Sequence, residues 1–291
     1  MTPAFECVLD VKASLGECPV WSVNERVLYW IDIRAPSLNR FDPSTGGNTV
    51  WSMPASIGCF GLRRGGGFIA ALRDGCWLLD RNGGLERKVA EAPYDAASHR
   101  FNDGRVDARG RLWAGSMNER RDGASAKLYR LDAAFKLTAM IPGITISNGL
   151  AFSPDGRTLY HADTPTRTIN AWDFDVATGD IANRRIFAQF ADEMERPDGA
   201  AVDREGCYWI TFYHAGKVAR LSSRGERLAE YAVPAMCPTM CAFGGPDLKT
   251  LYVTTARQHR EAEELERFPQ SGGIFAMRVA VPGLPEPKFA G

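Results

Sequence analysis

The sequence predicts an all-β fold, a six-bladed β-propeller with four strands in each blade, which spans residues 1–291 as a single domain. Three observations support this prediction. Polar or small residues recur ahead of short β-rich runs at intervals of 41 to 50 residues, a period typical of propellers. Each repeat contains runs rich in aromatic and β-branched residues. The 29 glycines and 17 prolines stand between these runs, which favours many turns over long helices.

Each repeat begins with one residue that is followed, four positions later, by an apolar side chain and, four positions after that, by a turn. In the fullest example Asp198 precedes Val202 and then Gly206. The same spacing identifies six equivalent residues, which we call the phase positions: Glu17, Gly58, Asn102, Asn148, Asp198 and Thr239.

After its phase position, each repeat continues as an inner strand, a polar turn and further strands. The second strands are expected at 27–33, 68–72, 111–115, 158–161, 208–212 and 250–254. The third strands are expected at 38–42, 77–80, 127–131, 168–174, 218–221 and 274–279. Asn-Gly and Asp-Gly pairs tolerate the positive φ of tight hairpins, so they are suitable turns between these strands and the fourth.

Two segments that do not follow the repeat pattern are assigned to the last blade. Residues 5–11 form a β-like run that belongs to no repeat. We expect this run to complete the last blade beside residues 273–279, because an open ring would leave strand edges unpaired. Residues 256–268 carry charges at i,i+3 and i,i+4 spacing, which predicts a short solvated helix inside the last blade.

Composition argues against several classes of protein. The formal net charge is zero, with 35 basic and 35 acidic residues and no basic stripe, so we expect no nucleic-acid partner. No run of about 18 apolar residues is present, so we expect no membrane span. The N-terminal residues lack the features of a secretory signal, and the seven scattered cysteines are typical of free thiols, which together predict a cytoplasmic location.

The phase positions predict a polar site on the propeller axis. The innermost strands of a propeller run along its central shaft, so residues at one phase meet near the axis. Glu17 and Asp198 would bring two carboxylates together, and carboxylates repel each other unless a cation or a shared proton lies between them. With the amides of Asn102 and Asn148 they suit a hard divalent ion. All four histidines lie off the phase, which argues against a histidine zinc site. The alternative is that these side chains line a water-filled channel and cap turns.

The same residues suggest a catalytic arrangement. Asp198 is the candidate general base for an attacking water. Arg100 lies two residues before Asn102 and therefore on the same face of an extended strand, where both could donate hydrogen bonds to a polar small molecule. The alternative for Arg100 is a surface ion pair. Glu119 could reach over the opening from a loop, or be a solvated loop charge. Four aromatic residues could line the mouth, although core packing is the usual fate of such side chains: Trp51, Phe60, Trp113 and Tyr213.

Seven segments of the chain also carry a family resemblance: 15–21, 100–107, 110–117, 147–156, 164–169, 197–199 and 241–252. In these segments the chain resembles the gluconolactonase and regucalcin (senescence-marker protein) family of six-bladed propellers. The resemblance implies a single divalent metal held by Glu17, Asn148 and Asp198, and it implies Asp198 as the catalytic acid/base. It also implies substrate contacts from Arg100, Asn102 and Glu119.

The reaction implied by the resemblance is metal-dependent hydrolysis of a sugar lactone to the aldonic acid in a sugar-oxidation pathway. We expect one metal ion, with Ca²⁺, Mg²⁺, Mn²⁺, Zn²⁺ and Fe²⁺ all open, a small-molecule sugar lactone as partner, and a monomer or weak homo-oligomer. Two alternatives remain: a non-catalytic calcium-binding regulator, and a metal-dependent esterase or phosphotriesterase on the same site. A scaffold has no need for two carboxylates and two amides at one phase, and donors to hydroxyl groups favour a sugar.

Overall fold

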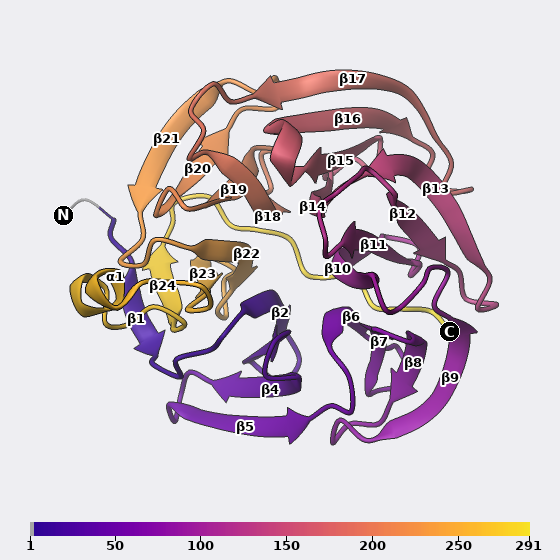
Figure 1. Ribbon diagram of the computed structural model, residues 1–291, viewed down its shortest axis with the longest axis horizontal. Helices are drawn as coiled ribbons and strands as arrows, with labels where there is room; N and C mark the ends of the chain where they lie inside the picture. The colour runs from indigo at the N-terminus through magenta and orange to yellow at the C-terminus, as the bar shows by residue number, and fades with distance from the viewer. Residues whose placement is uncertain (1–2) are drawn as a thin grey trace.

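The computed structural model describes residues 3–291, and its 24 strands form six four-stranded antiparallel sheets. The sheets are arranged as a ring around a central shaft (Figure 1). The inner strands of adjacent blades contact one another around the whole ring, from β2 and β6 to β22 and β2. The predicted six-bladed β-propeller is therefore confirmed, whereas the interpretation of 1–291 as one domain stays a prediction.

From the shaft outward, the first blade contains β2 (Gly16–Ser22), β3 (Val27–Asp32), β4 (Ser37–Asp42) and β5 (Gly47–Ser52). The second contains β6 (Ile57–Leu62), β7 (Phe68–Leu72), β8 (Gly75–Leu79) and β9 (Leu85–Glu91). The third contains β10 (His99–Val106), β11 (Leu112–Asn118), β12 (Ala126–Leu131) and β13 (Leu137–Ile144).

The fourth blade contains β14 (Ser147–Phe152), β15 (Thr158–Asp163), β16 (Thr168–Phe174) and β17 (Ile181–Gln189), with the short 3₁₀ turn η1 (Thr164–Thr166) between β15 and β16. The fifth contains β18 (Arg196–Val202), β19 (Tyr208–Tyr213), β20 (Lys217–Leu221) and β21 (Arg227–Ala232). The sixth contains β22 (Pro238–Gly244), β23 (Thr250–Thr255), β24 (Ile274–Arg278) and β1 (Glu6–Leu9). Strands β7 and β16 have the predicted bounds, and β11 differs most because it continues to Asn118.

The sixth blade is closed by the N-terminal strand. β1 pairs with β24, with Glu6 opposite Ala276 and Cys7 opposite Phe275. The expected closure by residues 5–11 is thus confirmed, although the strand is shorter. Helix α1 (Ala262–Arg267) lies between β23 and β24 and has no buried residue, as expected for a short solvated helix.

A β-bulge accompanies the phase position in every inner strand. The pairing register shifts between Glu17 and Val20 in β2, and equivalent shifts occur in β6, β10, β14, β18 and β22. A bulge kinks a strand and changes the direction in which a side chain points. The residues that follow Glu17 and Asn148 have positive φ, 47° at Cys18 and 62° at Gly149. The sequence repeat therefore marks a repeated irregularity of the backbone as well as a repeated strand.

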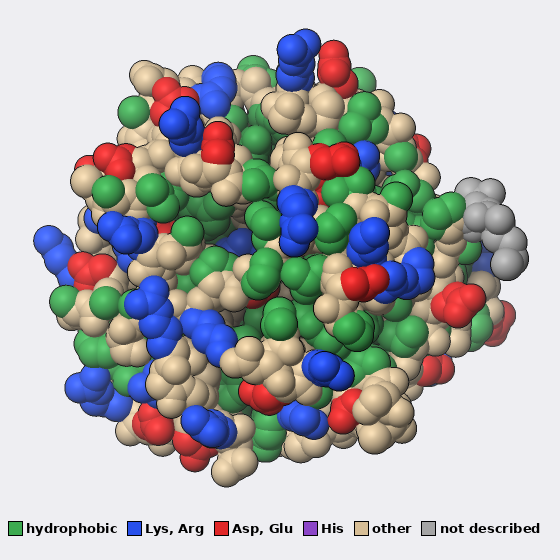
Figure 2. All heavy atoms as spheres, turned by 180° about the vertical axis from the view of Figure 1, so that it is seen from behind, with side chains coloured by type: hydrophobic (Ala, Val, Ile, Leu, Met, Phe, Trp, Pro, Cys, Tyr) green, Lys and Arg blue, Asp and Glu red, His purple; other side chains and the backbone are tan. Residues whose placement is uncertain are grey.

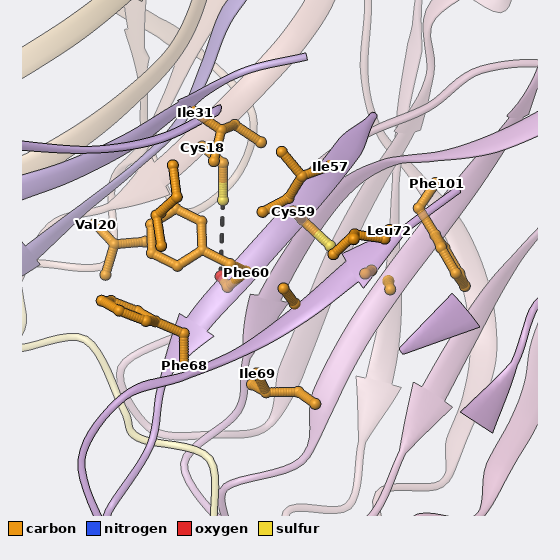
Figure 3. Close-up of a cluster of buried hydrophobic side chains, with 14 of the residues drawn as sticks. Cys18, Val20, Ile31, Ile57, Cys59, Phe60, Phe68, Ile69, Leu72 and Phe101 are labelled. Atoms are coloured by element: carbon orange, nitrogen blue, oxygen red, sulfur yellow. Dashed lines mark hydrogen bonds between the residues drawn. The ribbon is translucent and has the colours of Figure 1, made fainter. Parts of the chain in front are cut away.

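Apolar packing between blades holds these bulges in place. Figure 3 shows one such cluster, in which Cys18 from β2 points toward Phe60 of β6 and lies near Ile31 of β3. The Cys18 thiol contacts the Phe60 carbonyl oxygen at 3.7 Å. Burial of each large apolar side chain stabilises a fold by about 1.5–3 kcal/mol. The residue beside Glu17 is thus anchored in the core. All seven cysteines are free thiols, as the sequence predicts.

The C-terminal segment 279–291 covers one end of the shaft, and its yellow trace crosses the ring in Figure 1. The backbone N–H of Phe289 donates to the Leu62 carbonyl at 2.8 Å in the second blade. Glu286 forms an ion pair with Arg105, whose guanidinium also donates to the Ala200 carbonyl at 2.6 Å. Since Arg105 lies near the end of β10, the segment closes the shaft where the inner strands end. A site on the axis must open at the other end, where these strands begin.

The surface combines both signs of charge. Figure 2, which views the face opposite to that of Figure 1, shows acidic and basic side chains interspersed with apolar ones. No helix within residues 3–291 is long and apolar enough to span a membrane. The absence of a nucleic-acid partner and the cytoplasmic location stay predictions.

Candidate active site

A cavity of about 700 Å³ lies where the inner strands begin. Arg100 lines it. So do four of the six phase positions: Glu17, Asn102, Asn148 and Asp198. These four come from β2, β10, β14 and β18, so four different blades contribute one side chain each. The convergence expected from the repeat therefore occurs for these four residues.

The other two phase positions serve packing. A Cβ atom added to Gly58 would lie 2.3 Å from the backbone of Phe101, so only glycine allows this approach of β6 to β10. Thr239 is fully buried, and its hydroxyl is hydrogen-bonded to the Thr254 hydroxyl at 2.8 Å. Neither residue lines the cavity. Both keep adjacent elements close together.

A chain of hydrogen bonds joins the third, fourth and fifth blades along the cavity floor. Arg100 Nη1 donates to Asn102 Oδ1 at 2.8 Å, and Asn102 Nδ2 donates to Asn148 Oδ1 at 2.9 Å. Asn148 Nδ2 then donates to the hydroxyl of Thr164, which donates to the Pro197 carbonyl, each at 2.8 Å. The expected shared face of Arg100 and Asn102 is thus observed. The network fixes the Asn148 amide and leaves a second lone pair on Oδ1 available.

Three buried carboxylates lie close to this network, those of Glu17, Asp103 and Asp198. Burial, together with the charge of Asp103, raises the pKa of Glu17 to about 8. Burial, and then the charges of Glu17 and Asp103, raise the pKa of Asp198 well above its ordinary value. Burial raises the pKa of Asp103 to about 6. Each group therefore resists ionisation because burial excludes water, and Glu17 and Asp198 do so also because neighbouring carboxylates have the same sign.

Few hydrogen bonds compensate these carboxylates. Glu17 Oε2 accepts a hydrogen bond from the Cys18 backbone N–H at 3.0 Å. Asp103 Oδ2 accepts one from the Leu150 N–H at 2.9 Å, whereas its buried Oδ1 has no partner in residues 3–291. The Asp198 carboxylate lines the cavity and accepts no hydrogen bond from any group in residues 3–291. Ionisation of these carboxylates would therefore be favoured by a cation bound between them.

The donor set fits a hard divalent cation. Carboxylate oxygens from Glu17 and Asp198 and the amide oxygen of Asn148 are the ligand types that Ca²⁺, Mg²⁺ and Mn²⁺ accept. No cluster of three or more His, Cys, Asp or Glu side chains suited to a metal occurs in residues 3–291. A metal at this place would therefore depend on the Asn148 amide and on water or substrate for its remaining positions.

Arg100 and Glu119 belong to a second charged group beside the cavity. Arg100 is only 4% exposed, so the alternative of a surface ion pair does not describe it. Burial, opposed by the charge of Glu119, lowers the pKa of Arg100 to about 10, which leaves it cationic at neutral pH. Glu119 lies outside the cavity lining, where its carboxylate contacts Arg73 at 2.7 Å, Arg34 at 3.4 Å and Arg100 at 3.6 Å. Its contact with substrate stays a prediction, and its position favours holding Arg100.

Several cavity residues were not singled out as site candidates by sequence reasoning: Thr164, Arg121, Arg167, Arg196 and His214. Nor was Asp103, whose charge acts on Asp198. Thr164 lies in a segment that carries the family resemblance, so its position was a usable signal. The arginines come from loops and strand starts, for which the repeat gives no spacing. Of the four candidate mouth aromatics, Tyr213 lines the cavity, whereas Phe60 and Trp113 are fully buried and Trp51 packs against the core.

Comparison with known proteins identifies the same architecture elsewhere. Residues 15–257 match the model of the SMP-30/Gluconolactonase/LRE-like region. The chain is 49% identical to 6-deoxy-6-sulfogluconolactonase from Pseudomonas putida over 100% of both chains. It is 35% identical to regucalcin from Gallus gallus, with 99% of this chain and 98% of the relative covered.

A solved structure agrees with these sequence matches. The calcium-binding protein regucalcin from Agrobacterium tumefaciens superposes with a TM-score of 0.94 and 29% identity, covering 99% of this chain and 97% of that chain. The resemblance inferred from the seven segments is thereby confirmed. The chain belongs to the SMP-30/gluconolactonase/LRE-like family of six-bladed β-propellers.

Proposed function

We propose that this protein is a metal-dependent lactonase that hydrolyses a sugar lactone to the aldonic acid. One observation carries the proposal: the buried carboxylates of Glu17 and Asp198, which have few hydrogen-bond partners, line one cavity together with the polar side chains of Arg100, Asn102 and Asn148. A cyclic ester needs a base for water and donors for its oxygens, and this cavity has both.

Asp198 is the proposed general base. It takes a proton from water and returns it to the ring oxygen when the acyl–oxygen bond breaks. Arg100 and Asn102, already joined by a hydrogen bond, orient the ring and hydroxyl oxygens of the sugar. Glu17, Asn148 and Asp198 would hold the divalent ion. When bound, such an ion polarises the ester carbonyl and stabilises the negative charge that develops during attack.

The name of one relative supports a sugar lactone as the substrate. The Pseudomonas putida relative is named for a gluconolactone with a sulfonate in place of the hydroxyl at carbon 6. We propose that this chain also acts on a lactone, because the two sequences align over their whole length. A sugar lactone arises by oxidation of a cyclic sugar at its anomeric carbon, so a sugar dehydrogenation is the proposed preceding reaction.

The deciding experiment measures proton release from a panel of aldonolactones by chelated protein, before and after Ca²⁺, Mg²⁺, Mn²⁺, Zn²⁺ or Fe²⁺ is added back. We expect hydrolysis faster than the spontaneous rate that depends on one of these ions. Spontaneous opening of each lactone in the same buffer is the control. Tight metal binding without hydrolysis of any lactone would instead support the calcium-binding regulator, and hydrolysis restricted to aryl esters or phosphotriesters would support the esterase.

The position of Glu119 leads to a separate prediction. Glu119→Gln should raise the KM for the lactone roughly twofold to fivefold with little change in kcat, because a partly exposed ion pair that orients Arg100 is lost. Glu86→Gln is the matched control, since it removes an Arg–Glu pair of 2.7 Å with Arg63, which does not line the cavity. A fall in kcat with unchanged KM would contradict this positioning role.

A further inference from the structure

Three arginines line the cavity beyond its carboxylate floor: Arg121, Arg167 and Arg196. We call them the arginine rim. Arg121 lies in the loop after β11, Arg167 directly follows η1, and Arg196 begins β18. Three separate segments therefore bring a guanidinium group to the same cavity, although none of them belongs to the repeat that places the floor.

The charges of the arginine rim are not neutralised by direct pairing. In the part of the chain that the structure describes, none of the three forms an ion pair with a carboxylate, whereas Arg100 has Glu119. Arg167 Nη1 donates to the Ala191 carbonyl at 3.1 Å, and Arg196 Nε donates to the Glu193 carbonyl at 3.3 Å. These acceptors are neutral, so each guanidinium retains its charge and free donors.

Two acidic residues also line this part of the cavity, Asp122 and Glu193. Asp122 accepts a hydrogen bond from Asn118 Nδ2 at 2.7 Å, and the contact between Glu193 and Arg196 uses the Glu193 backbone carbonyl. The three cations therefore outnumber the carboxylates beyond the floor.

His214 lines the same cavity, and its pKa is affected by the charges of the arginine rim. Burial, followed by the charges of Arg260, Arg196 and Arg121, lowers the pKa of His214 to about 4. Two residues of the arginine rim thus act on a side chain of the cavity wall, and they disfavour a further positive charge there. The charges of Arg196 and Arg121 would attract an anion placed at the same point.

Backbone conformation sets the direction in which two of these side chains leave the chain. Arg121 and Arg167 have positive φ, 56° and 55°, a backbone region that residues other than glycine seldom adopt. Asn118 holds the first of these loops, since its side chain also accepts the Arg120 N–H at 3.0 Å. Such conformations persist where the surrounding structure over-determines them.

We propose that the arginine rim is an anion subsite, and that the preferred substrate is a sugar lactone with an anionic group remote from its ester carbonyl. The lactone half of this statement rests on the proposed function, and the anion half rests on the rim. The ester would lie at the carboxylate floor, while a sulfonate, phosphate or carboxylate accepts hydrogen bonds from Arg121, Arg167 and Arg196. The cavity of about 700 Å³ is within the ordinary size of small-molecule sites.

The test compares lactones of one ring that differ in the terminal group: glucono-1,5-lactone and its 6-phosphate, 6-sulfonate and 6-carboxylate counterparts. Wild-type kcat/KM should be at least about tenfold higher for an anionic lactone than for the neutral one, and the three anions are ranked by the same measurement. Arg196→Gln should remove most of this preference through KM and leave the neutral lactone unchanged. Salt should raise the KM of the anionic lactone only.

Arg224→Gln is the matched control, because it removes one exposed positive charge from the turn between β20 and β21, outside the cavity. If the triple variant R121Q/R167Q/R196Q retains the wild-type preference, or if the wild type has none, the anion subsite is wrong.

Sulfate binding separates this proposal from the proposed function. Calorimetry with sodium sulfate should detect binding to the wild type and to R224Q, and no binding to the triple variant. That result would support the subsite even if every lactone were left intact, in which case only the lactonase assignment would fail. Equal sulfate binding by all three proteins would overturn the subsite regardless of activity.

Discussion

Asp198→Asn is expected to lower kcat for lactone hydrolysis by at least about a thousandfold and to raise the melting temperature of the metal-free protein. The first effect follows from loss of the only proposed base, since an amide cannot accept the proton of water at neutral pH. The second follows because burial and the charges of Glu17 and Asp103 disfavour the ionised Asp198 carboxylate. An isosteric neutral side chain removes that repulsion.

The measurement combines proton release with thermal unfolding in excess chelator. Each kcal/mol added to the free energy of unfolding should raise the melting temperature by about 2–4 °C in a protein of this size class. Asp10→Asn is the control, because Asp10 is an exposed carboxylate after β1 that pairs with Lys12 at 2.8 Å. Wild-type turnover by the Asp198→Asn variant would remove Asp198 from the catalytic role, whatever its effect on stability.

The second large effect concerns pH and the metal-free protein. In chelator, the free energy of unfolding should fall as pH rises from about 4.5 to about 8, the window between the ordinary and the raised pKa of Glu17. Within this window the folded state binds a proton that the unfolded state has released, so unfolding becomes more favourable as pH increases. The slope for one such proton is about 1.4 kcal/mol per pH unit.

Glu17→Gln should flatten this slope and abolish the stabilisation that a divalent ion provides. A bound ion stabilises the folded state most at high pH, where both carboxylates are ionised, so metal should reverse the trend in the wild type. Urea unfolding at pH 5, 6.5 and 8, with chelator or with Ca²⁺, measures both effects. Glu86→Gln should behave as the wild type, since Glu86 is an exposed partner of Arg63. An unchanged slope in Glu17→Gln would show that the proton resides elsewhere.

The two variants share one physical cause. The floor of the cavity combines carboxylates that destabilise the empty fold with a geometry suited to a cation. Replacement of either carboxylate is therefore expected to stabilise the metal-free protein and to impair function. The charge of Glu17 raises the pKa of Asp198, so the two groups do not titrate independently and both variants are needed to describe their titration.

Prediction from sequence succeeded where a local pattern has a geometric consequence. The spacing of Glu17, Asn102, Asn148 and Asp198 indicated one level of the shaft, and all four line one cavity. The same spacing could not separate them from Gly58 and Thr239, because a repeat reports the path of the backbone. Whether a residue faces the cavity or a neighbouring strand depends on how adjacent blades approach one another.

The positions of loop residues are harder to predict from the sequence. The sequence allows Glu119 either to reach over the opening or to be a solvated loop charge. Its location among Arg34, Arg73 and Arg100 depends on contacts between segments far apart in sequence. Arg121, Arg167 and Arg196 share no spacing, so no period could bring them together. Their convergence depends on the closed ring and on loop conformations such as the positive φ of Arg121 and Arg167.

The sequence by itself determined the six-bladed architecture, the closure by the N-terminal strand and the six phase positions, which include the four polar residues of the floor. Each of these is encoded by strand periodicity or by an unpaired strand, which are properties of short segments. Only the tertiary structure decided how the C-terminal segment closes the shaft through Glu286 and Arg105, and which charges surround the cavity. Those features depend on side chains brought together by folding, and their pKa values and partners arise from burial, which a linear sequence does not contain.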